Sequence, residues 1–158
     1  MNLTIRRAQD KDADRMLVLL GQVLEVHAKI RPDIFISGST KYRREDLFGM
    51  FRDESRIILA AVDERDVLQG YAVCELQRQP FGTTMKDFTT LYIDDLCVDE
   101  ACRGQHIGKM LYEAVLETAR GMGCYDVTLN VWEGNDAARA FYEAMGMGIK
   151  ETTMEVIL

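Results

Sequence analysis

The sequence predicts an α+β fold in which one sheet changes from antiparallel to parallel near its middle. Two observations lead to this class. Apolar, β-branched runs at 57–62 and 67–77 flank a charged turn, as in a hairpin. A further run at 88–98 is followed by a helix-type pattern and by another run at 126–131, as in a parallel strand–helix–strand unit. Ligands tend to bind beyond the carboxyl ends of such parallel strands.

The start of the chain predicts a short strand and a long helix. Leu3 to Arg6 can form the strand, and Asp10 or Asp12 can cap a helix whose apolar stripe runs from Ala13 to His27. Pro32 ends this helix, because proline disfavours the helical conformation of the preceding residue.

The middle of the chain predicts a second, shorter helix and two hairpins. Leu47, Phe48 and Phe51 share one side of a helix expected at 44–52. The second hairpin has its loop at 80–83 and joins the runs at 67–77 and 88–98.

The last third of the chain predicts two helices and a closing strand. The first of these helices follows the run at 88–98, and Gly121 and Gly123 end it. Asn135 or Asp136 caps the second, expected at 137–145, and residues 151–157 are predicted to form the final strand.

Length and composition favour one domain spanning residues 1–158. The chain has 158 residues, of which 47% are hydrophobic and 28% charged, which is enough for one core. A formal net charge of −7 argues against a nucleic-acid or membrane partner and favours cationic ones. The sequence shows neither a signal peptide nor a membrane-spanning run, so we expect a cytoplasmic protein.

The four cysteines are expected to be reduced thiols. Cys74, Cys97, Cys102 and Cys124 lie in or beside apolar stretches, and no two are spaced as C-x-x-C. The spacing therefore predicts no metal site.

A glycine-containing turn between the run at 88–98 and the following helix is a candidate anion site. Gly104 and Gly108 let the backbone approach a ligand, and the free N–H groups at the helix start favour phosphate oxygens. The turn fits neither a Walker A loop nor a dinucleotide-binding loop. The alternative is a simple helix start.

Read as Arg103-x-x-His106-x-Gly108, the turn resembles the acyl-CoA pyrophosphate loop of the GNAT superfamily of N-acetyltransferases. His106 departs from the family pattern, which has glycine there, but histidine tolerates positive φ. The stretch from Asn130 to Gly146 is similar to the second signature of that family, with Asn135 and a Phe-Tyr pair that includes Tyr142.

The resemblance implies a GNAT fold, with a splayed parallel pair of strands, and acetyl-CoA as co-substrate. Tyr142 would protonate the leaving thiolate, for which a phenol is a competent general acid; its alternative role is packing along a helix edge. The residues implied to contact the co-substrate are Leu96, Cys97, Val98, Arg103, Gly104, Gln105, His106, Ile107, Gly108, Lys109, Asn130, Asn135, Ala137, Ala138 and Tyr142.

Asp94 and Asp95 are the candidate residues for contact with the acceptor amine. Adjacent carboxylates on an apolar strand are costly to bury unless they face a cavity, and the alternative is a solvated strand end. The Asp-Asp-Leu-x-Val strand is similar to that of diamine and polyamine acetyltransferases, which implies Asp94 as the base, acting through water, and Asp95 as an amine contact. His27 is either a structural residue or a further substrate contact.

Together these features predict an N-acetyltransferase that moves the acetyl group of acetyl-CoA to a primary amine by direct attack in a ternary complex, without a metal. The acidic balance favours a small cationic amine. A non-catalytic acyl-CoA sensor or interaction module, and a protein N-terminal or lysine acetyltransferase, are the alternatives. Homodimerisation is an expectation from the family resemblance alone.

Overall fold

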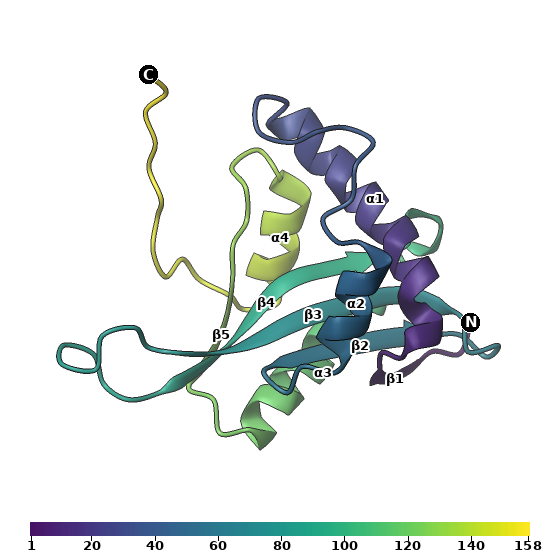
Figure 1. The fold of residues 1–158 in the computed structure, drawn as a ribbon, viewed down its shortest axis with the longest axis horizontal. Helices are drawn as coiled ribbons and strands as arrows, with labels where there is room; N and C mark the ends of the chain where they lie inside the picture. Colours follow the sequence, from purple (N-terminus) through teal and green to yellow (C-terminus); the bar gives the residue numbers. More distant parts are fainter.

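The computed structural model describes all residues 1–158 and contains one five-stranded sheet in the order β1-β2-β3-β4-β5 (Figure 1). The strands are β1 (Thr4–Arg7), β2 (Arg56–Val62), β3 (Leu68–Arg78), β4 (Thr89–Val98) and β5 (Asp126–Leu129). The first four are antiparallel neighbours, and β5 is parallel to β4. The predicted change from antiparallel to parallel pairing is confirmed.

Helices cover both faces of this sheet. They are α1 (Ala13–Ile30), α2 (Arg44–Phe51), α3 (Ile107–Gly121) and α4 (Asp136–Ala144), with short 3-10 turns at Asp10–Asp12 and Glu100–Cys102. Figure 1 shows α1 and α2 on one side of the strands and α3 on the other. No helix in the structure is both long and apolar enough to cross a lipid bilayer.

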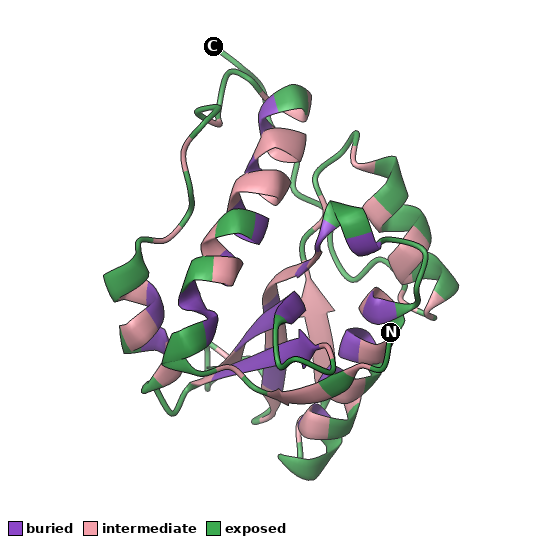
Figure 2. Cartoon of the chain, turned by 90° about the vertical axis from the view of Figure 1, so that its right-hand side faces the viewer, coloured by how far each residue is buried: buried purple, intermediate pink, exposed green.

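Each face of the sheet carries its own hydrophobic core. On β2, Ile58 and Ala60 pack beneath α1 and α2, while Ile57 and Leu59 belong to the core beneath α3. Successive side chains of a strand point to opposite faces, so a strand covered on both faces is apolar throughout. This arrangement explains the uninterrupted apolar run that marks β2 in the sequence, and Figure 2 shows these central strands as the buried part of the molecule.

Gly70 on β3 allows α3 to pack closely against the sheet. A Cβ atom there would lie 3.1 Å from Leu111 Cδ1, 3.2 Å from Ile107 Cγ2 and 3.0 Å from the carbonyl oxygen of Cys97. These contacts are tighter than most that real Cβ atoms make, so a larger residue would push α3 or β4 away by a few tenths of an ångström, and glycine favours the α3–sheet distance that the structure has.

Most elements lie where the sequence predicted them, with two corrections. The prediction that the strand after α3 extends to Val131 is wrong, since β5 ends at Leu129. The prediction of a strand at 151–157 is also wrong for the isolated chain, because this segment pairs with no strand and forms no regular element. Strand-type sequence cannot form a ladder without a partner strand.

The thiols agree with the sequence-based expectation. All four cysteines are free, and Cys74, Cys97 and Cys102 are buried. Burial raises the pKa of the Cys74 and Cys97 thiols to about 12, so both stay protonated at neutral pH.

Candidate active site

β4 and β5 separate part-way along their length and leave one edge of β4 unpaired. The two strands pair only from Thr90–Asp126 to Ile93–Leu129, whereas β4 continues to Val98 and stays paired with β3 to that end. The main-chain groups of Leu96, Cys97 and Val98 that face β5 are therefore available to a ligand lying in the gap. An extended ligand can add to such an edge as a strand would.

The turn after β4 has a conformation that only a few residue types adopt. Gly104 has φ +82°, and His106, the N-cap residue of α3, has φ +61°. The expectation that histidine would tolerate a positive φ at this position is confirmed. A Cβ atom placed on Gly108 would lie 3.4 Å from the Phe141 ring, an ordinary packing distance, so α4 lies directly against the start of α3.

The main-chain N–H groups from Arg103 to Lys109 all lack a partner within the protein. The last N–H before the turn that is bonded belongs to Cys102, and the first after it belongs to Met110, which donates to the His106 carbonyl oxygen at 3.0 Å. Arg103 is exposed and forms no ion pair, and Lys109 has only a 3.8 Å contact with Glu113. Free N–H groups at a helix start, flanked by two cations, form a site for phosphate groups.

A cavity of about 570 Å³ lies where β4 and β5 separate and extends beneath α1. Of the residues predicted as site residues, the cavity is lined by His27, Asp94, Asp95, Leu96, Asn130, Asn135, Ala138 and Tyr142. The predicted site residues at 97, 98, 103–109 and 137 lie outside it, and Ala137 is an exposed residue of α4. The cavity and the turn at 103–109 lie at the two ends of the unpaired edge of β4.

The two adjacent carboxylates have different surroundings. The β3–β4 register shifts at Asp94, so this residue has no partner on β3 and both carboxylates can line the cavity. Asp94 Oδ2 accepts hydrogen bonds from Lys41 Nζ at 3.0 Å and from Tyr42 Oη at 2.5 Å. Asp95 Oδ2 accepts one from Tyr71 Oη at 2.7 Å.

These surroundings set the protonation of the groups in the cavity. Burial is the main cause that raises the pKa of Asp95, although the hydrogen bond from Tyr71 opposes it. Burial, and next the negative charge of Asp95, raise the pKa of Tyr142. Burial and then the charge of Lys41 lower the pKa of His27, which keeps its imidazole neutral. At neutral pH Tyr142 is therefore a phenol with a proton to give.

The two asparagines of the second motif form hydrogen bonds beside the cavity. Asn135 Oδ1 accepts a hydrogen bond from the Ala138 N–H at 3.4 Å and so caps α4, as the sequence predicted. Asn130 Nδ2 donates to Tyr92 Oη at 3.2 Å. The Tyr142 ring packs 5.0 Å from that of Phe141 and 6.2 Å from that of Tyr112, which fixes its position on α4.

Several residues of the site were missed by sequence reasoning. Lys41 and Tyr42 come from the irregular segment between α1 and α2, and Tyr71 from the middle of β3. Phe35 and Trp132 stack edge to face 5.3 Å apart in the cavity wall. Trp132 lies within the Asn130–Gly146 motif, but its side chain was given no role; the other four residues belong to no local motif and offered no signal.

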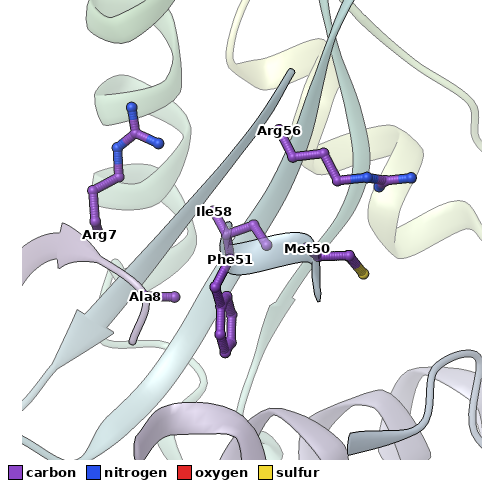
Figure 3. Close-up of a pocket in the computed structure, with 6 residues that line it drawn as sticks. All are labelled: Arg7, Ala8, Met50, Phe51, Arg56 and Ile58. Carbon is purple, nitrogen blue, oxygen red and sulfur yellow. The ribbon is translucent and has the colours of Figure 1, made fainter. Parts of the chain in front are cut away.

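A second cavity, of about 90 Å³, lies between β1, β2 and the end of α2 and is lined by Arg7, Ala8, Met50, Phe51, Arg56 and Ile58 (Figure 3). The guanidinium groups of Arg7 and Arg56 point in different directions in Figure 3, and no set of polar groups converges on a common point. A ligand site needs such converging groups, so this cavity is a packing gap.

Comparison with known proteins identifies the family. Residues 22–147 match the family described as acetyltransferase (GNAT). The chain belongs to the GNAT acetyltransferase family. It is accordingly an acetyl-CoA-dependent N-acetyltransferase, and the sequence-based assignments of family and fold are confirmed.

Relatives of this GNAT protein cover nearly its whole length. The peptidyl-lysine N-acetyltransferase YjaB of Salmonella typhimurium is 28% identical over 94% of this chain and 86% of its own. The thialysine N-epsilon-acetyltransferase of Bos taurus is 27% identical over 90% of this chain and 82% of its own. The crystal structure of a mutant BH1408 protein from Bacillus halodurans is 36% identical and superposes with a TM-score of 0.93, covering 98% of this chain and 99% of that one.

GNAT enzymes use acetyl-CoA as co-substrate, and the geometry described above fits that molecule. The unpaired N–H groups from Arg103 to Lys109 suit its pyrophosphate, and the free edge of β4 suits its extended amide-containing arm. The free edge leads from the turn to the cavity, which Tyr142 lines.

Proposed function

We propose that this enzyme acetylates a primary amine at the end of a short aliphatic chain, as in lysine and related small cationic amines. The observation that carries the proposal is the cavity, which combines apolar walls with two carboxylates at the β4 bulge. Phe35 and Trp132 suit an aliphatic chain, and Asp95 suits the ammonium group at its end.

The salt bridge between Lys41 and Asp94 narrows the proposed class of acceptor amines. Asp94 already has a cationic partner, so Asp95 is the one carboxylate at the bulge without an ionic partner. A substrate with a single ammonium group in this region fits better than a polyamine with several. The two full-length relatives named above act, by their names, on lysine-type amines, and this supports the same acceptor class here.

In the proposed mechanism the amine nitrogen attacks the thioester carbonyl carbon directly. The C–N bond forms as the C–S bond breaks, and a main-chain N–H on the free edge of β4 near Val98 stabilises the charge on the carbonyl oxygen. Tyr142 gives its proton to the departing sulfur, because burial keeps the phenol protonated, and it regains a proton from the second N–H that the nitrogen loses as the amide forms. Ala138 and Tyr142 both line the cavity, and the small side chain of Ala138 leaves room for the thioester.

The amine proton must leave before or during attack, and we propose that a carboxylate at the β4 bulge takes it. Asp94 is the residue to which the sequence resemblance assigns this role. Asp94 is already hydrogen-bonded to Lys41 and Tyr42, whereas Asp95 has no cationic partner and burial favours its protonation. The structure therefore favours Asp95 as the proton acceptor and Asp94 as the residue that holds Lys41 and Tyr42 in the cavity wall.

The decisive assay measures thiol release from acetyl-CoA with an amine panel: lysine, thialysine, a lysine-containing peptide, putrescine, spermidine, glucosamine 6-phosphate and an aminoglycoside. We expect the highest kcat/KM for lysine or thialysine. A preference for spermidine or for the aminoglycoside would contradict the proposed acceptor class while leaving the transferase activity intact.

Replacing Tyr142 by phenylalanine tests catalysis against mere binding. We expect Tyr142→Phe to lower kcat by about 100-fold or more, the usual contribution of a general acid, while calorimetry shows an unchanged Kd for acetyl-CoA. Tyr112→Phe, which alters a neighbouring ring outside the cavity, serves as the matched control. Unchanged turnover in Tyr142→Phe would remove the general-acid role.

A further inference from the structure

Lys41 is a primary amine that the chain itself places in the wall of the large cavity. Its Nζ donates a hydrogen bond to Asp94 Oδ2 at 3.0 Å, and Asp95 and Tyr142 line the same cavity. The side chain of Lys41 therefore has the chemistry of the proposed acceptor, an amine at the end of an aliphatic chain. The other lysines of the sequence lie outside the cavity lining; they are Lys11, Lys29, Lys86, Lys109 and Lys150.

The ion pair with Asp94 holds the Lys41 ammonium only loosely. The Lys41 side chain is 47% exposed and that of Asp94 17% exposed, so water screens the pair. Ion pairs in which the cation is this exposed contribute little to stability. When the ammonium moves away, Asp94 Oδ2 keeps the hydrogen bond from Tyr42 Oη at 2.5 Å. Lys41 can therefore leave Asp94 without stranding the carboxylate.

The backbone around Lys41 can also shift along the cavity wall. Lys41 lies in the irregular segment between α1 and α2 (Figure 1). The backbone groups of residues 40–42 take part in no main-chain hydrogen bond. The segment is anchored before them by the Gly38 N–H, which donates to Glu25 Oε1 at 2.6 Å, and after them by α2, which begins at Arg44. A small displacement of Lys41 therefore breaks no main-chain hydrogen bond.

The charge of Lys41 acts on the groups that would take part in the reaction. Burial raises the pKa of Asp95, and the hydrogen bond from Tyr71 and the charge of Lys41 oppose that rise. Burial and then the charge of Lys41 lower the pKa of His27. The Lys41 ammonium is thus close enough to Asp95 to stabilise the carboxylate that the proposed mechanism uses as proton acceptor.

We propose that the enzyme acetylates Lys41 of its own chain when acetyl-CoA is bound and no acceptor amine fills the cavity. This inference rests on the proposed function, because it needs the same cavity to accept a lysine-type amine. The effect of holding amine and thioester in one cavity is to replace an encounter between molecules by a step within one complex.

The reaction follows the same course as for a free acceptor. The Lys41 ammonium gives one proton to a carboxylate at the bulge, and its nitrogen then attacks the thioester carbonyl carbon. The C–N bond forms and the C–S bond breaks, and CoA leaves as a thiol with the proton of Tyr142. Tyr142 regains a proton from the second N–H that the nitrogen loses as the amide forms. The products are acetylated Lys41, free CoA and the proton that the carboxylate releases to water.

The modification changes the charge of the cavity. An acetylated lysine side chain carries no positive charge, so Asp94 loses its ionic partner. The modified cavity is therefore more negative than the unmodified one.

The test uses the full chain and acetyl-CoA with a deuterated acetyl group, without added amine. Peptide mass spectrometry follows the label with time. We expect Lys41 to be labelled about tenfold or more faster than the exposed Lys29 and Lys86, which report chemical acetylation by free acetyl-CoA. The rate constant at Lys41 should not change when the protein is diluted. Saturating desulfo-CoA, which lacks the thiol, should slow labelling of Lys41 and not of Lys29.

Two matched variants check the assignment in the intact protein. Lys41→Arg keeps a cation beside Asp94 but removes the primary amine, so we expect it to lose the fast-added acetyl group. Lys29→Arg makes the same exchange at an exposed position of α1 outside the cavity, and it should still gain one acetyl group as fast as the unchanged protein.

Three results would each overturn the inference: equal labelling of Lys41 and Lys29, labelling of Lys41 that desulfo-CoA does not slow, and a rate constant that rises with protein concentration. The last would mean that one copy acetylates another.

Turnover of free lysine and thialysine, measured on the same preparation, separates this inference from the proposed function. Turnover without labelling of Lys41 overturns the self-acetylation and leaves the proposed function intact. Labelling of Lys41 without turnover of any free amine supports the self-acetylation and overturns the small-amine acceptor.

Discussion

Asp95 shows how a single side chain couples stability to the chemistry of the site. Its carboxyl group lies beneath the cavity, bonded to Tyr71, and burial raises its pKa. The folded protein therefore holds this proton more tightly than the unfolded chain does. The resulting stabilisation is fully present below the unfolded-state pKa, about 3.9 for an aspartate, and is lost as the pH rises through the folded-state pKa.

Replacing Asp95 by asparagine should remove the free-energy cost of burying a charged carboxylate at high pH. The asparagine side chain would keep the shape and the hydrogen-bond acceptor for Tyr71 but carry no charge. We therefore expect Asp95→Asn to raise the melting temperature at pH 8 more than at pH 5. We also expect it to lower kcat. Thermal unfolding at both pH values measures the first effect. Asp94→Asn is the control: it weakens the contacts with Lys41 and Tyr42 and should lower the melting temperature at pH 8.

Among single residues, those within a local motif could be predicted and those brought together by folding could not. Tyr142 and the Arg103–Lys109 turn were predicted from the family resemblance of two local motifs, and the structure gives the turn free N–H groups and Tyr142 a place in the cavity. Tyr71 reaches Asp95 only because β3 and β4 pair in one register, across 24 residues of sequence. Nothing near Tyr71 in the sequence signals that partnership.

At the scale of elements, one ion pair joins α1 to the end of β4. Arg15 of α1 donates to Asp99 at 2.5 Å, and Asp99 also accepts from the Ala101 N–H in the turn that precedes the phosphate site. The Asp99 side chain is 13% exposed and that of Arg15 32%, so solvent screens the pair only in part. The pair positions the start of the turn against the first helix.

We expect Arg15→Ala to lower the free energy of unfolding at pH 7 by about 1.5–3 kcal/mol, the usual range for a hydrogen bond to a charged group. Arg15 lowers the pKa of Asp99, so this stabilisation is present above the unfolded-state pKa and is lost as the pH falls through the folded-state pKa. Urea denaturation at pH 7 and pH 3 measures it. A destabilisation of the same size at both pH values would show that packing, not charge, is responsible.

A helix or strand could be predicted where the sequence shows both its apolar periodicity and the residues that begin and end it. α3 and α4 have apolar stripes and defined caps, and both were located within a residue or two. β5 was predicted two residues too long, because Asn130 and Val131 continue the strand-type pattern after β4 has turned away. Strand length is set by the neighbouring strand, which one segment of sequence does not describe.

At the scale of the whole molecule, the co-substrate site draws on β4, α3 and α4 together, so its occupation should stabilise the fold. A ligand that binds only the folded state at 100 times its Kd adds about 2.7 kcal/mol to the free energy of unfolding. We expect acetyl-CoA at that concentration to raise the melting temperature accordingly.

Thermal unfolding with and without acetyl-CoA checks this expectation, each protein being compared with its own ligand-free form. Gly104→Val should lose most of the shift, because a β-branched residue is strained at φ +82° and the turn cannot keep its shape. An unchanged shift in this variant would mean that the turn does not hold the pyrophosphate.

The order of the sheet also has a consequence for how the chain folds. β2, β3 and β4 follow one another in sequence and are neighbours in the sheet, so the central part of the sheet can assemble through local hairpins. Closing short loops costs little chain entropy, and local contacts speed folding. β5, in contrast, is connected to β4 only through the long crossover that contains α3. We therefore expect the antiparallel part of the sheet to form first and the gap between β4 and β5 to form last in folding.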